Sequence, residues 1–299
     1  MHGHAVINLH AGTVLALSAD EVARQVREGF AAAGHAIDVR LVTPDRLGAV
    51  LDAVAGMDGD VLLVGGGDGT LRGAAQRLAG GRKALGVLPL GTMNRYARDL
   101  NIPLDLTAAV AALAAGEIHS VDVGELNGQV FLCNSTLGLP ARYSRQRQRL
   151  RGRDAGERAL GYWRTVRAVL RARHWLALAI DDGHDARRLR VLSLAISNNA
   201  YAEQASLMLT RPRLDGGELG VYVSRHRSGL RMAWALLRVM FGRWHGDPYL
   251  DAGTARQVTI DAKRPLRVVN DGELDFVHPP LVYRTRPGAL RVLRPAAAA

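Results

Sequence analysis

A glycine-rich stretch with one carboxylate, Gly65-Gly66-Gly67-Asp68-Gly69-Thr70, lies between an apolar run and a helix-like run. Glycine lets backbone N–H groups approach a ligand closely, and the N-terminus of the following helix adds partial positive charge. This turn therefore favours a bound phosphate. Asp68 does not suit a pure anion site, but a carboxylate beside phosphates can hold Mg²⁺ or orient the reacting group. The alternative is a tight glycine-rich turn without a ligand.

A second loop of similar character follows the next predicted strand, where Gly91, Thr92 and Asn94 precede a helix-like run. Thr92 and Asn94 could cap that helix or bind a ligand. Because α/β sheets bind ligands at the carboxyl ends of their strands, the two loops together favour one shared site. Their spacing matches neither the Walker A loop, which requires Gly-Lys-Ser/Thr, nor the dinucleotide fingerprint.

The elements that must position these loops alternate between strand and helix patterns up to about residue 120. Such alternation predicts a parallel sheet with helices on both faces. Ser18 is the predicted N-cap and Gly34 the predicted C-cap of one helix, and Pro44 suits the first turn of the next. The predicted strands are 4–12, 36–43, 60–66 and 84–91, and the predicted helices are 18–34, 44–56, 71–80 and 104–116.

The rest of the chain is dominated by strand patterns and predicts an antiparallel β domain, so the fold class is α/β followed by all-β. Asn127-Gly128 is a strong hairpin signal. A pair of strands is predicted within 174–200. Further strands are predicted at 219–226, within 255–275 and at 288–295, with helical segments near 157–173 and 229–241.

Composition limits the class of protein. The chain has 299 residues, 48% of them hydrophobic, and no apolar run reaches the roughly 18 residues that span a bilayer. The sole cysteine, Cys133, excludes an intramolecular disulfide and is expected to be buried. With no secretory leader at the start, we expect a cytoplasmic protein. The net charge of +11 suggests an anionic partner, nucleic acid, nucleotide or membrane surface, or a merely solvated basic surface.

The combination of Gly65–Thr70 with Pro89–Leu100, "PLGTMNRYARDL", resembles the diacylglycerol kinase catalytic domain family, which includes soluble bacterial lipid kinases and the sphingosine and ceramide kinases. The resemblance continues at Asp215–Val223 and at Asn270–Phe276, "NDGELDF", and so covers nearly the whole chain. The first motif alone is shared with NAD kinases and phosphofructokinases. The combination is much more specific.

The resemblance implies a Rossmann-like ATP-binding domain, 1–120, and a β-sandwich domain for the lipid substrate, 121–299, whose extreme C-terminus could pack back on the first domain. It implies that the loop from Gly66 to Thr70 binds the phosphates of ATP. The loop of Asn8 lacks the proline that the family has there. The full set of expected nucleotide-binding residues is Asn8, Thr43, Gly65, Gly66, Gly67, Asp68, Gly69, Thr70, Gly91, Thr92 and Asn94.

The late motif supplies a carboxylate for the reaction. The resemblance makes Glu273 the general base that accepts the proton of a lipid hydroxyl, with Asp271 beside it and Asp68 next to ATP-bound Mg²⁺. Taken as residues alone, Asn270-Asp271-Gly272 predicts a β-turn.

Three positions depart from the family pattern. Arg95 stands where the family often has aspartate, and Gly73 lies near the place of a common glutamate. Gly216 replaces an aspartate that holds a structural magnesium ion in some bacterial relatives, which leaves Asp215, or Glu218, as a weak metal candidate.

The basic segment from Arg142 to Arg173 is the candidate membrane contact, because anionic headgroups attract arginine, and Trp163 and Trp175 could lie at the interface. The alternative is a solvated helix that packs on the β domain.

We expect a peripheral protein whose lipid substrate lies at the inner membrane face, with no specific nucleic acid partner. A homodimer is an alternative to a monomer. The leading hypothesis is an ATP- and Mg²⁺-dependent kinase of a diacylglycerol-like lipid. Its alternatives are a sphingoid or ceramide kinase, an NAD-kinase-like phosphotransferase and a non-catalytic nucleotide-binding regulator.

Overall fold

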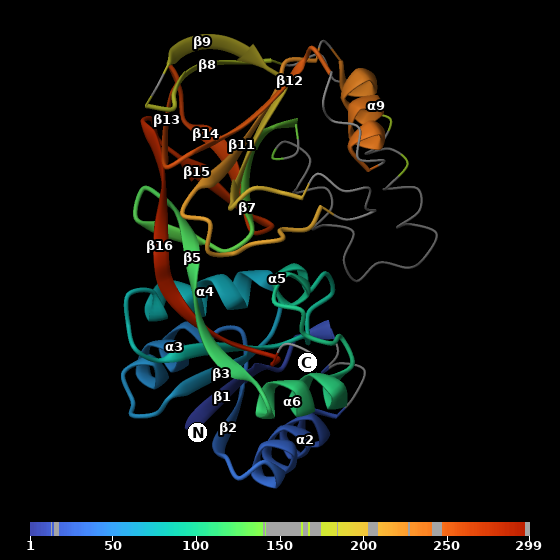
Figure 1. The fold of residues 1–299 in the computed structure, drawn as a ribbon, viewed down its shortest axis with the longest axis vertical. Helices are drawn as coiled ribbons and strands as arrows, with labels where there is room; N and C mark the ends of the chain where they lie inside the picture. The colour runs from blue at the N-terminus through green and yellow to red at the C-terminus, as the bar shows by residue number, and fades with distance from the viewer. Residues whose placement is uncertain are drawn as a thin grey trace. The chain divides into compact units, whose positions relative to one another are not determined.

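The chain forms two compact units, Met1–Val123 with Arg286–Ala299 (unit 1) and Gly124–Thr285 (unit 2) (Figure 1). The structure is a computed structural model. It describes residues 1–12, 14, 18–139, 141, 163, 167, 175–183, 185–202, 209–226, 228–240 and 247–296. Two long strands, β5 (Glu117–Leu126) and β16 (Leu281–Arg294), contribute residues to both units.

Unit 1 is built on a parallel sheet with the strand order β2-β1-β3-β4. The C-terminal part of β16 extends this sheet, because Val292 pairs in parallel with Leu85. Strands β3 and β4 are buried at every position, as expected for a sheet covered on both faces. The strands are β1 (His2–Asn8), β2 (Ala36–Val42), β3 (Val61–Gly65) and β4 (Ala84–Leu88).

Helices cover both faces of this sheet (Figure 1). One pair, α2 and α6, packs together, and α3 packs against α4. Right-handed crossovers require this separation, since the chain moves one way along the sheet from β1 to β2 and the other way from β2 to β3 and β4. The helices are α2 (Ala19–Ala32), α3 (Leu47–Ala55), α4 (Asp68–Leu78), α5 (Arg95–Asp99) and α6 (Leu106–Ala114).

Helix boundaries agree with the sequence in part. Ser18 caps α2 as predicted, with its Oγ accepting a hydrogen bond from the Glu21 amide at 3.1 Å. The C-cap itself is Ala33, and Gly34 follows it with φ +76. The prediction for Pro44 was wrong: α3 begins at Leu47, and Pro44 lies in the turn before it.

Unit 2 consists of two mainly antiparallel sheets. One has the order β12-β11-β10-β7-β14-β15, and the other joins β9-β8-β13 to the first half of β16. The hairpin of β5 and β6 also belongs to the second sheet. The strands are β6 (Gln129–Phe131), β7 (Asn134–Gly138), β8 (Leu176–Asp181), β9 (Ala186–Val191), β10 (Ser193–Asn198), β11 (Leu219–Ser224), β12 (Leu250–Ala255), β13 (Gln257–Asp261), β14 (Leu266–Asn270) and β15 (Glu273–Val277).

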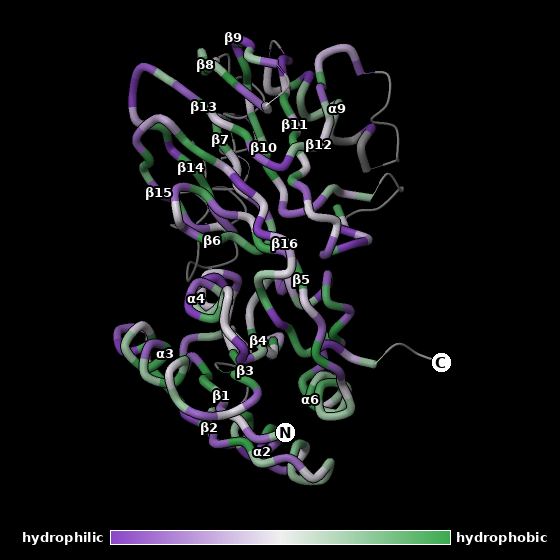
Figure 2. Tube along the Cα trace, turned by 60° about the vertical axis from the view of Figure 1, so that its left-hand side comes forward, coloured by the Kyte–Doolittle hydropathy of each residue, from purple (hydrophilic) through white to green (hydrophobic). Residues whose placement is uncertain are grey.

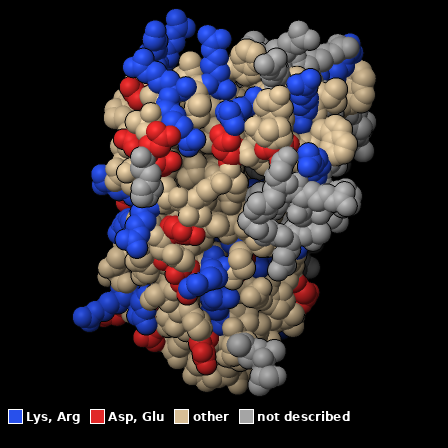
Figure 3. All heavy atoms as spheres, turned by 45° about the horizontal axis from the view of Figure 1, so that its top comes forward, with Lys and Arg blue, Asp and Glu red and all other residues tan. Residues whose placement is uncertain are grey.

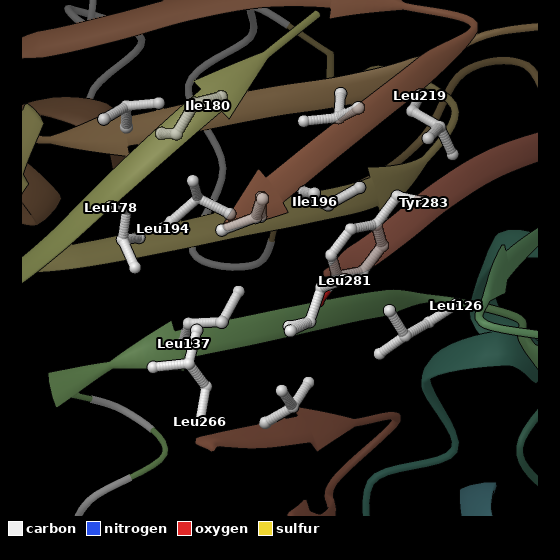
Figure 4. Packing of buried hydrophobic residues seen from close by; sticks show 14 of the residues in the cluster. Leu126, Leu137, Leu178, Ile180, Leu194, Ile196, Leu219, Leu266, Leu281 and Tyr283 are labelled. Carbon is white, nitrogen blue, oxygen red and sulfur yellow. The ribbon is translucent and has the colours of Figure 1, made fainter. Parts of the chain in front are cut away.

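Both sheets of unit 2 contribute to one hydrophobic core, as in a sandwich. Leu178 and Ile180 come from β8, and Leu194 and Ile196 come from β10 of the other sheet (Figure 4). Tyr283 on β16 is buried among them, and its hydroxyl lies 2.9 Å from Ser135 Oγ. Burial raises the pKa of the Tyr283 hydroxyl above its ordinary value.

Figure 2 shows hydrophobic and hydrophilic segments in both units, but the patterns along their strands differ. The central strands of unit 1 are apolar throughout, whereas strands of unit 2 such as β13 alternate between buried and exposed residues. This alternation follows the two-residue period of a strand with one covered face. The described residues contain no helix that is both long and apolar enough to cross a bilayer.

Two hairpins of unit 2 have two-residue turns in the left-handed region. Asn127 and Gly128 have φ 47 and 85 between β5 and β6, which confirms the predicted hairpin. Asp271 and Gly272 have φ 48 and 91 between β14 and β15, which confirms the predicted β-turn.

Other predictions in unit 2 were incomplete. The segment 174–200 contains three strands rather than two, and the edge strand β12 was not predicted because its sequence, LDAGTA, lacks a regular apolar pattern. The predicted helix at 229–241 is α9 (Gly229–Met240). The predicted helix at 157–173 lies outside the described residues, apart from Trp163 and Arg167.

Lys83 supports a helix end in unit 1. Its buried Nζ donates hydrogen bonds to the carbonyls of Val54, at 2.7 Å, and Met57, at 2.6 Å, at the C-terminus of α3. The Val54 carbonyl also accepts from the Met57 amide at 3.2 Å, so Lys83 gives it a second hydrogen bond and supplies one to the Met57 carbonyl beyond the end of the helix.

We expect Lys83→Met to lower the free energy of unfolding by about 1–3 kcal/mol, because it keeps the apolar stem and removes both hydrogen bonds that Nζ donates at this helix end. Urea unfolding followed by circular dichroism measures this. Lys263 is the only other lysine and is exposed, so Lys263→Met is the matched control and should change stability by less than about 0.5 kcal/mol. Equal stability of the two variants would contradict the capping role.

Candidate functional site

The carboxyl ends of β1 and β3 flank a topological switch point. In the order β2-β1-β3-β4, the chain leaves β1 toward β2 and returns across β1 to form β3. Ligands of open α/β sheets bind outside such a point, where loops from opposite directions diverge. The loops after β1, β3 and β4 contain most of the residues that the sequence predicts to bind a nucleotide.

The loop after β3 leads directly into α4. This helix begins at Asp68, three positions earlier than the predicted Leu71, so Asp68, Gly69 and Thr70 form its first turn. Gly67 is the N-cap, and its carbonyl accepts hydrogen bonds from the amides of Thr70, at 2.9 Å, and Leu71, at 3.1 Å. The N-terminus of an 11-residue helix therefore lies at this loop and favours negative charge.

Gly66 and Gly67 differ in what surrounds them. A Cβ on Gly66 would lie 2.8 Å from Thr70 Cβ and Oγ1, so the fold itself requires glycine there. A Cβ on Gly67 would meet nothing within 4 Å, and the φ of −82 is allowed for any residue. The fold does not require glycine at position 67, whereas a ligand approaching the backbone would.

The loop after β4 lies directly against the loop after β3. A Cβ on Gly91 would be 2.8 Å from Gly67 Cα and 3.0 Å from the Gly66 carbonyl oxygen. Asn94 occupies the N-cap of α5 with φ 47, but its Nδ2 donates to the Pro89 carbonyl at 2.9 Å instead of capping the helix. The backbones of the two glycine loops thus contact each other, and the shared ligand site stays a prediction.

Thr92 is exposed on this surface and lies near the loop after β1, because its Oγ1 is 3.6 Å from the place of a Cβ on Gly12. Asn8 ends β1 and stabilises its own turn, with Oδ1 accepting from the His10 amide at 3.0 Å. Its side chain therefore shapes the loop.

Thr43 follows β2 at the same edge of the sheet. Its hydroxyl hydrogen bonds to Asp45 and, with the nearby charges of Arg46 and His10, holds the pKa of that carboxyl below its ordinary value. Thr43 is exposed, so it remains accessible at this edge.

Asp68 is half-buried in the first turn of α4 and has interactions with the surrounding protein. Among the described residues, no three His, Cys, Asp or Glu side chains could together hold a metal ion. A single carboxylate suits Mg²⁺ carried by a nucleotide, because Mg²⁺ is usually bound through one or two carboxylates together with substrate phosphates. The described donor set of unit 1 therefore fits nucleotide-bound Mg²⁺ and does not form a protein cage.

Asp271 in unit 2 is buried and fully used by the backbone. Its Oδ2 accepts from the Leu132 amide at 2.6 Å, and its Oδ1 accepts from the amides of Cys133, at 2.7 Å, and Asn134, at 3.0 Å. Burial raises the pKa of Asp271, while the three amides and the charge of Arg211 lower it. Asp271 thus fixes the tip of the β14–β15 hairpin to the segment between β6 and β7, which makes it a positioning residue.

The carbonyls of the same segment have buried partners. Arg211 Nη1 donates to the Leu132 carbonyl at 2.6 Å and to the Asn198 carbonyl at 2.8 Å. The Asn198 amide donates to the Cys133 carbonyl at 3.0 Å, and Cys133 is buried as predicted. Sequence analysis missed Arg211 and Asn198, since an arginine and an asparagine outside any motif carry no local signal.

Glu273 begins β15, two residues beyond Asp271, and is exposed. It pairs across the hairpin with Asn270, which pairs in turn with Ser135 on β7. Within the described parts of the chain, no hydrogen bond or ion pair engages its carboxylate. Glu273 is accordingly accessible on a rigid hairpin, as a proton acceptor would need to be.

Asp215 does not have the surroundings of a metal ligand. Its exposed carboxylate forms an ion pair with Arg213 at 3.2 Å, and Gly216 N donates instead to Asn199 Oδ1 at 2.8 Å. No metal-binding cluster including Asp215 or Glu218 occurs in the described residues. The donors present do not fit a structural magnesium ion here.

Comparison with known proteins identifies the family. A model of the diacylglycerol kinase catalytic domain matches residues 2–126, and a model of the YegS C-terminal NAD kinase beta sandwich-like domain matches residues 136–294. A probable lipid kinase YegS-like from Pseudomonas aeruginosa is 31% identical over 239 residues, 79% of this chain and 76% of that protein. This chain belongs to the diacylglycerol kinase and YegS-like family of lipid kinases.

Other relatives agree with this assignment. A diacylglycerol kinase of Staphylococcus aureus is 40% identical over 75 residues, 24% of each chain. A crystal structure of a putative diacylglycerol kinase from Bacillus anthracis superposes with a TM-score of 0.79 at 19% identity, covering 100% of this chain and 98% of that one. The resemblance predicted from the motifs and the predicted fold class are confirmed.

The glycine loops yield a prediction within unit 1. Gly67→Val should leave the fold stable, because nothing lies near its Cβ, but should weaken nucleotide binding by about tenfold or more by blocking backbone approach to phosphate. Gly91→Ala should lower stability, because its Cβ would collide with Gly67 and Gly66. Thermal unfolding and calorimetric titration with ATP separate the two effects. Unchanged ATP affinity in a folded Gly67→Val protein would contradict the phosphate loop.

Asp271 yields a second prediction, in unit 2. We expect Asp271→Asn to cost about 2–4 kcal/mol of unfolding free energy, because an amide NH₂ would face backbone N–H donors and Arg211 would lose its buried counter-charge. Glu273→Gln, on the same hairpin but exposed, is the control and should be as stable as the parent. Denaturant unfolding of both variants checks this, and an Asp271→Asn protein of parental stability would refute the positioning role.

Proposed function

We propose that this chain transfers the γ-phosphate of ATP to the hydroxyl of a diacylglycerol-like lipid, with Mg²⁺ bound to the nucleotide. The observation that carries the proposal is the contact between the two glycine loops beside the switch point, with Gly91 packed on the backbone of Gly66 and Gly67. This surface lies at the N-terminus of α4 and suits a polyphosphate. The family of lipid kinases to which the chain belongs makes ATP the expected phosphate donor.

Unit 1 binds and orients the nucleotide in this proposal. The backbone at Gly66–Thr70 and Gly91 contacts phosphate oxygens, and Thr43 and Thr92 offer exposed hydroxyls along the same edge. Magnesium supplies positive charge that neutralises the phosphates when it is bound with ATP. Asp68 would hold that ion from the first turn of α4.

Unit 2 supplies the base. Glu273 accepts the proton of the lipid hydroxyl as that oxygen forms its bond to the γ-phosphorus, and the bond to ADP breaks. Asp271 does not act as a base in this step, because both oxygens of its carboxylate already accept hydrogen bonds from three backbone amides. Its contribution is to hold the hairpin that presents Glu273.

The identity of the lipid acceptor is supported by fewer observations than the identity of the phosphate donor. A diacylglycerol-like substrate is supported by the similarity to the Staphylococcus diacylglycerol kinase, while the Pseudomonas relative is named only as a probable lipid kinase. A panel of diacylglycerol, monoacylglycerol, sphingosine, ceramide and phosphatidylglycerol, with NAD as a further acceptor, distinguishes the hypotheses. Phosphorylation of diacylglycerol above all others is expected. Transfer to NAD, or ATP binding without transfer to any acceptor, would overturn the proposal.

The role of Glu273 is tested by Glu273→Gln, which keeps the side-chain shape but removes the base. Turnover should fall by about 10²–10⁴-fold with little change in ATP affinity. Asp68→Asn is the companion variant: its turnover defect should lessen as Mg²⁺ concentration rises, whereas the Glu273→Gln defect should not. Steady-state kinetics over a magnesium series measure both.

Two results would contradict these roles. If Glu273→Gln had the turnover of the parent, Glu273 would not be the base. An Asp68→Asn defect that is independent of magnesium would separate Asp68 from the metal. Because Glu273→Gln is expected to fold normally, its loss of turnover can be attributed to chemistry.

A further inference from the structure

Helix α9 of unit 2 exposes large apolar side chains on its outer face. Leu230 and Trp234 are one turn apart and are 60% and 63% exposed. Trp234 is the most exposed of the large hydrophobic residues that the structure describes. Exposed large hydrophobic side chains placed side by side on one helix face mark an interaction surface more often than an isolated one does.

The opposite face of α9 already packs on the protein. Met232 and Ala235 are buried, and Met232 forms a small core with Leu139 and Leu192. Ser193 Oγ also donates a hydrogen bond to Met232 Sδ at 3.4 Å. Because this face anchors the helix to unit 2, Leu230 and Trp234 are held outward, and α9 appears at the outer side of the strands of this unit in Figure 1.

The charged residues of α9 and of the chain directly beside it are basic. The helix contains Arg231 and Arg238 and no acid, and residues 227–246 contain four arginines and no Asp or Glu. The next acids along the chain are engaged: Asp247 with His226 at 3.3 Å, and Asp251 with Arg225 at 2.9 Å. Figure 3 shows Lys and Arg side chains in the upper part of the view, with Asp and Glu side chains among them.

We propose that α9 is a membrane-docking element of this protein, with Leu230 and Trp234 inserted among the lipids and Arg231 and Arg238 at the headgroups of an anionic bilayer. Tryptophan, leucine and arginine in this arrangement are typical of helices that lie in the interfacial plane. A twelve-residue helix can lie on a bilayer but is too short to cross it. A second copy of this chain suits the face less well, because two such faces would bring arginines together.

This element differs from the basic segment that the sequence suggested for membrane contact, 142–173, which falls outside the described residues apart from Trp163 and Arg167. The inference deepens the proposed function, on which it rests for its purpose: a kinase whose lipid lies in a bilayer must reach that surface. Binding to vesicles can nevertheless be measured without any kinase activity.

Vesicle flotation tests the proposal with the full chain. The probe is a set of vesicles of phosphatidylcholine alone and of an equal mixture of phosphatidylglycerol and phosphatidylcholine. The double variant Leu230→Ser, Trp234→Ser should bind the mixed vesicles about tenfold or more weakly than the parent. The matched control is Leu104→Ser with Met57→Ser, which removes two exposed apolar side chains from unit 1 and should bind like the parent.

Charge is tested separately. Arg231→Glu should weaken binding to the mixed vesicles about tenfold and leave weak binding to phosphatidylcholine unchanged, and added salt should reduce the difference. Parental binding by the double serine variant would overturn the proposal. So would an equal loss in the unit 1 control, or a serine variant that changes only the oligomeric state seen by sedimentation.

A kinase assay keeps the two hypotheses apart. The double serine variant should lose turnover on diacylglycerol in vesicles in proportion to its lost binding, and should keep parental turnover on a short-chain diacylglycerol dispersed as monomers. A parent that binds vesicles through α9 but phosphorylates no lipid would refute the proposed function alone. A parent that phosphorylates vesicle lipid equally well without Leu230 and Trp234 would refute the docking element alone.

Discussion

The close approach of Gly91 to Gly66 and Gly67 is the constraint on which the nucleotide half of the protein depends. The backbones of these two loops touch, and no side chain fits between them there. The contact requires β3 and β4 to end at the same level, which their parallel pairing from Val61 and Ala84 to Gly65 and Leu88 ensures. The start of α4 at Asp68 then directs a helix N-terminus at the same place.

In unit 2, a buried carboxylate determines the position of the β14–β15 hairpin. Asp271 joins a hairpin tip to the β6–β7 segment through three amides, and Arg211 and Asn198 bind the carbonyls of that segment. A polar network of this kind is costly unless every member has a partner, so it specifies a single arrangement. The exposed Glu273 is consequently presented on a hairpin whose position is determined by buried bonds rather than by its own contacts.

The two units expose different kinds of surface because their sheets differ in strand direction. Parallel strands covered on both faces place loops at one edge, where backbone groups can bind phosphate. An antiparallel sandwich leaves hairpins and a peripheral helix at its surface, where a carboxylate and an apolar face can be offered to other molecules. Helix α9 follows the same pattern, because one face packs on unit 2 and the other face is exposed.

Local patterns determined much of this protein. The alternation of strand and helix, the Asn127-Gly128 hairpin, the Ser18 cap and the glycine loops are all properties of neighbouring residues, so the sequence by itself predicted them. It could not predict that the Asn94 side chain hydrogen bonds within its loop instead of capping α5. Nor could it predict that the Asp271 carboxylate accepts hydrogen bonds from the amides of Leu132–Asn134, more than a hundred positions away in the chain. Nor could it tell which apolar residues of α9 stay exposed, because Leu230 and Met232 are alike in hydrophobicity and differ only in what lies against them. Those outcomes depend on contacts between segments distant in sequence, which only the tertiary structure decides.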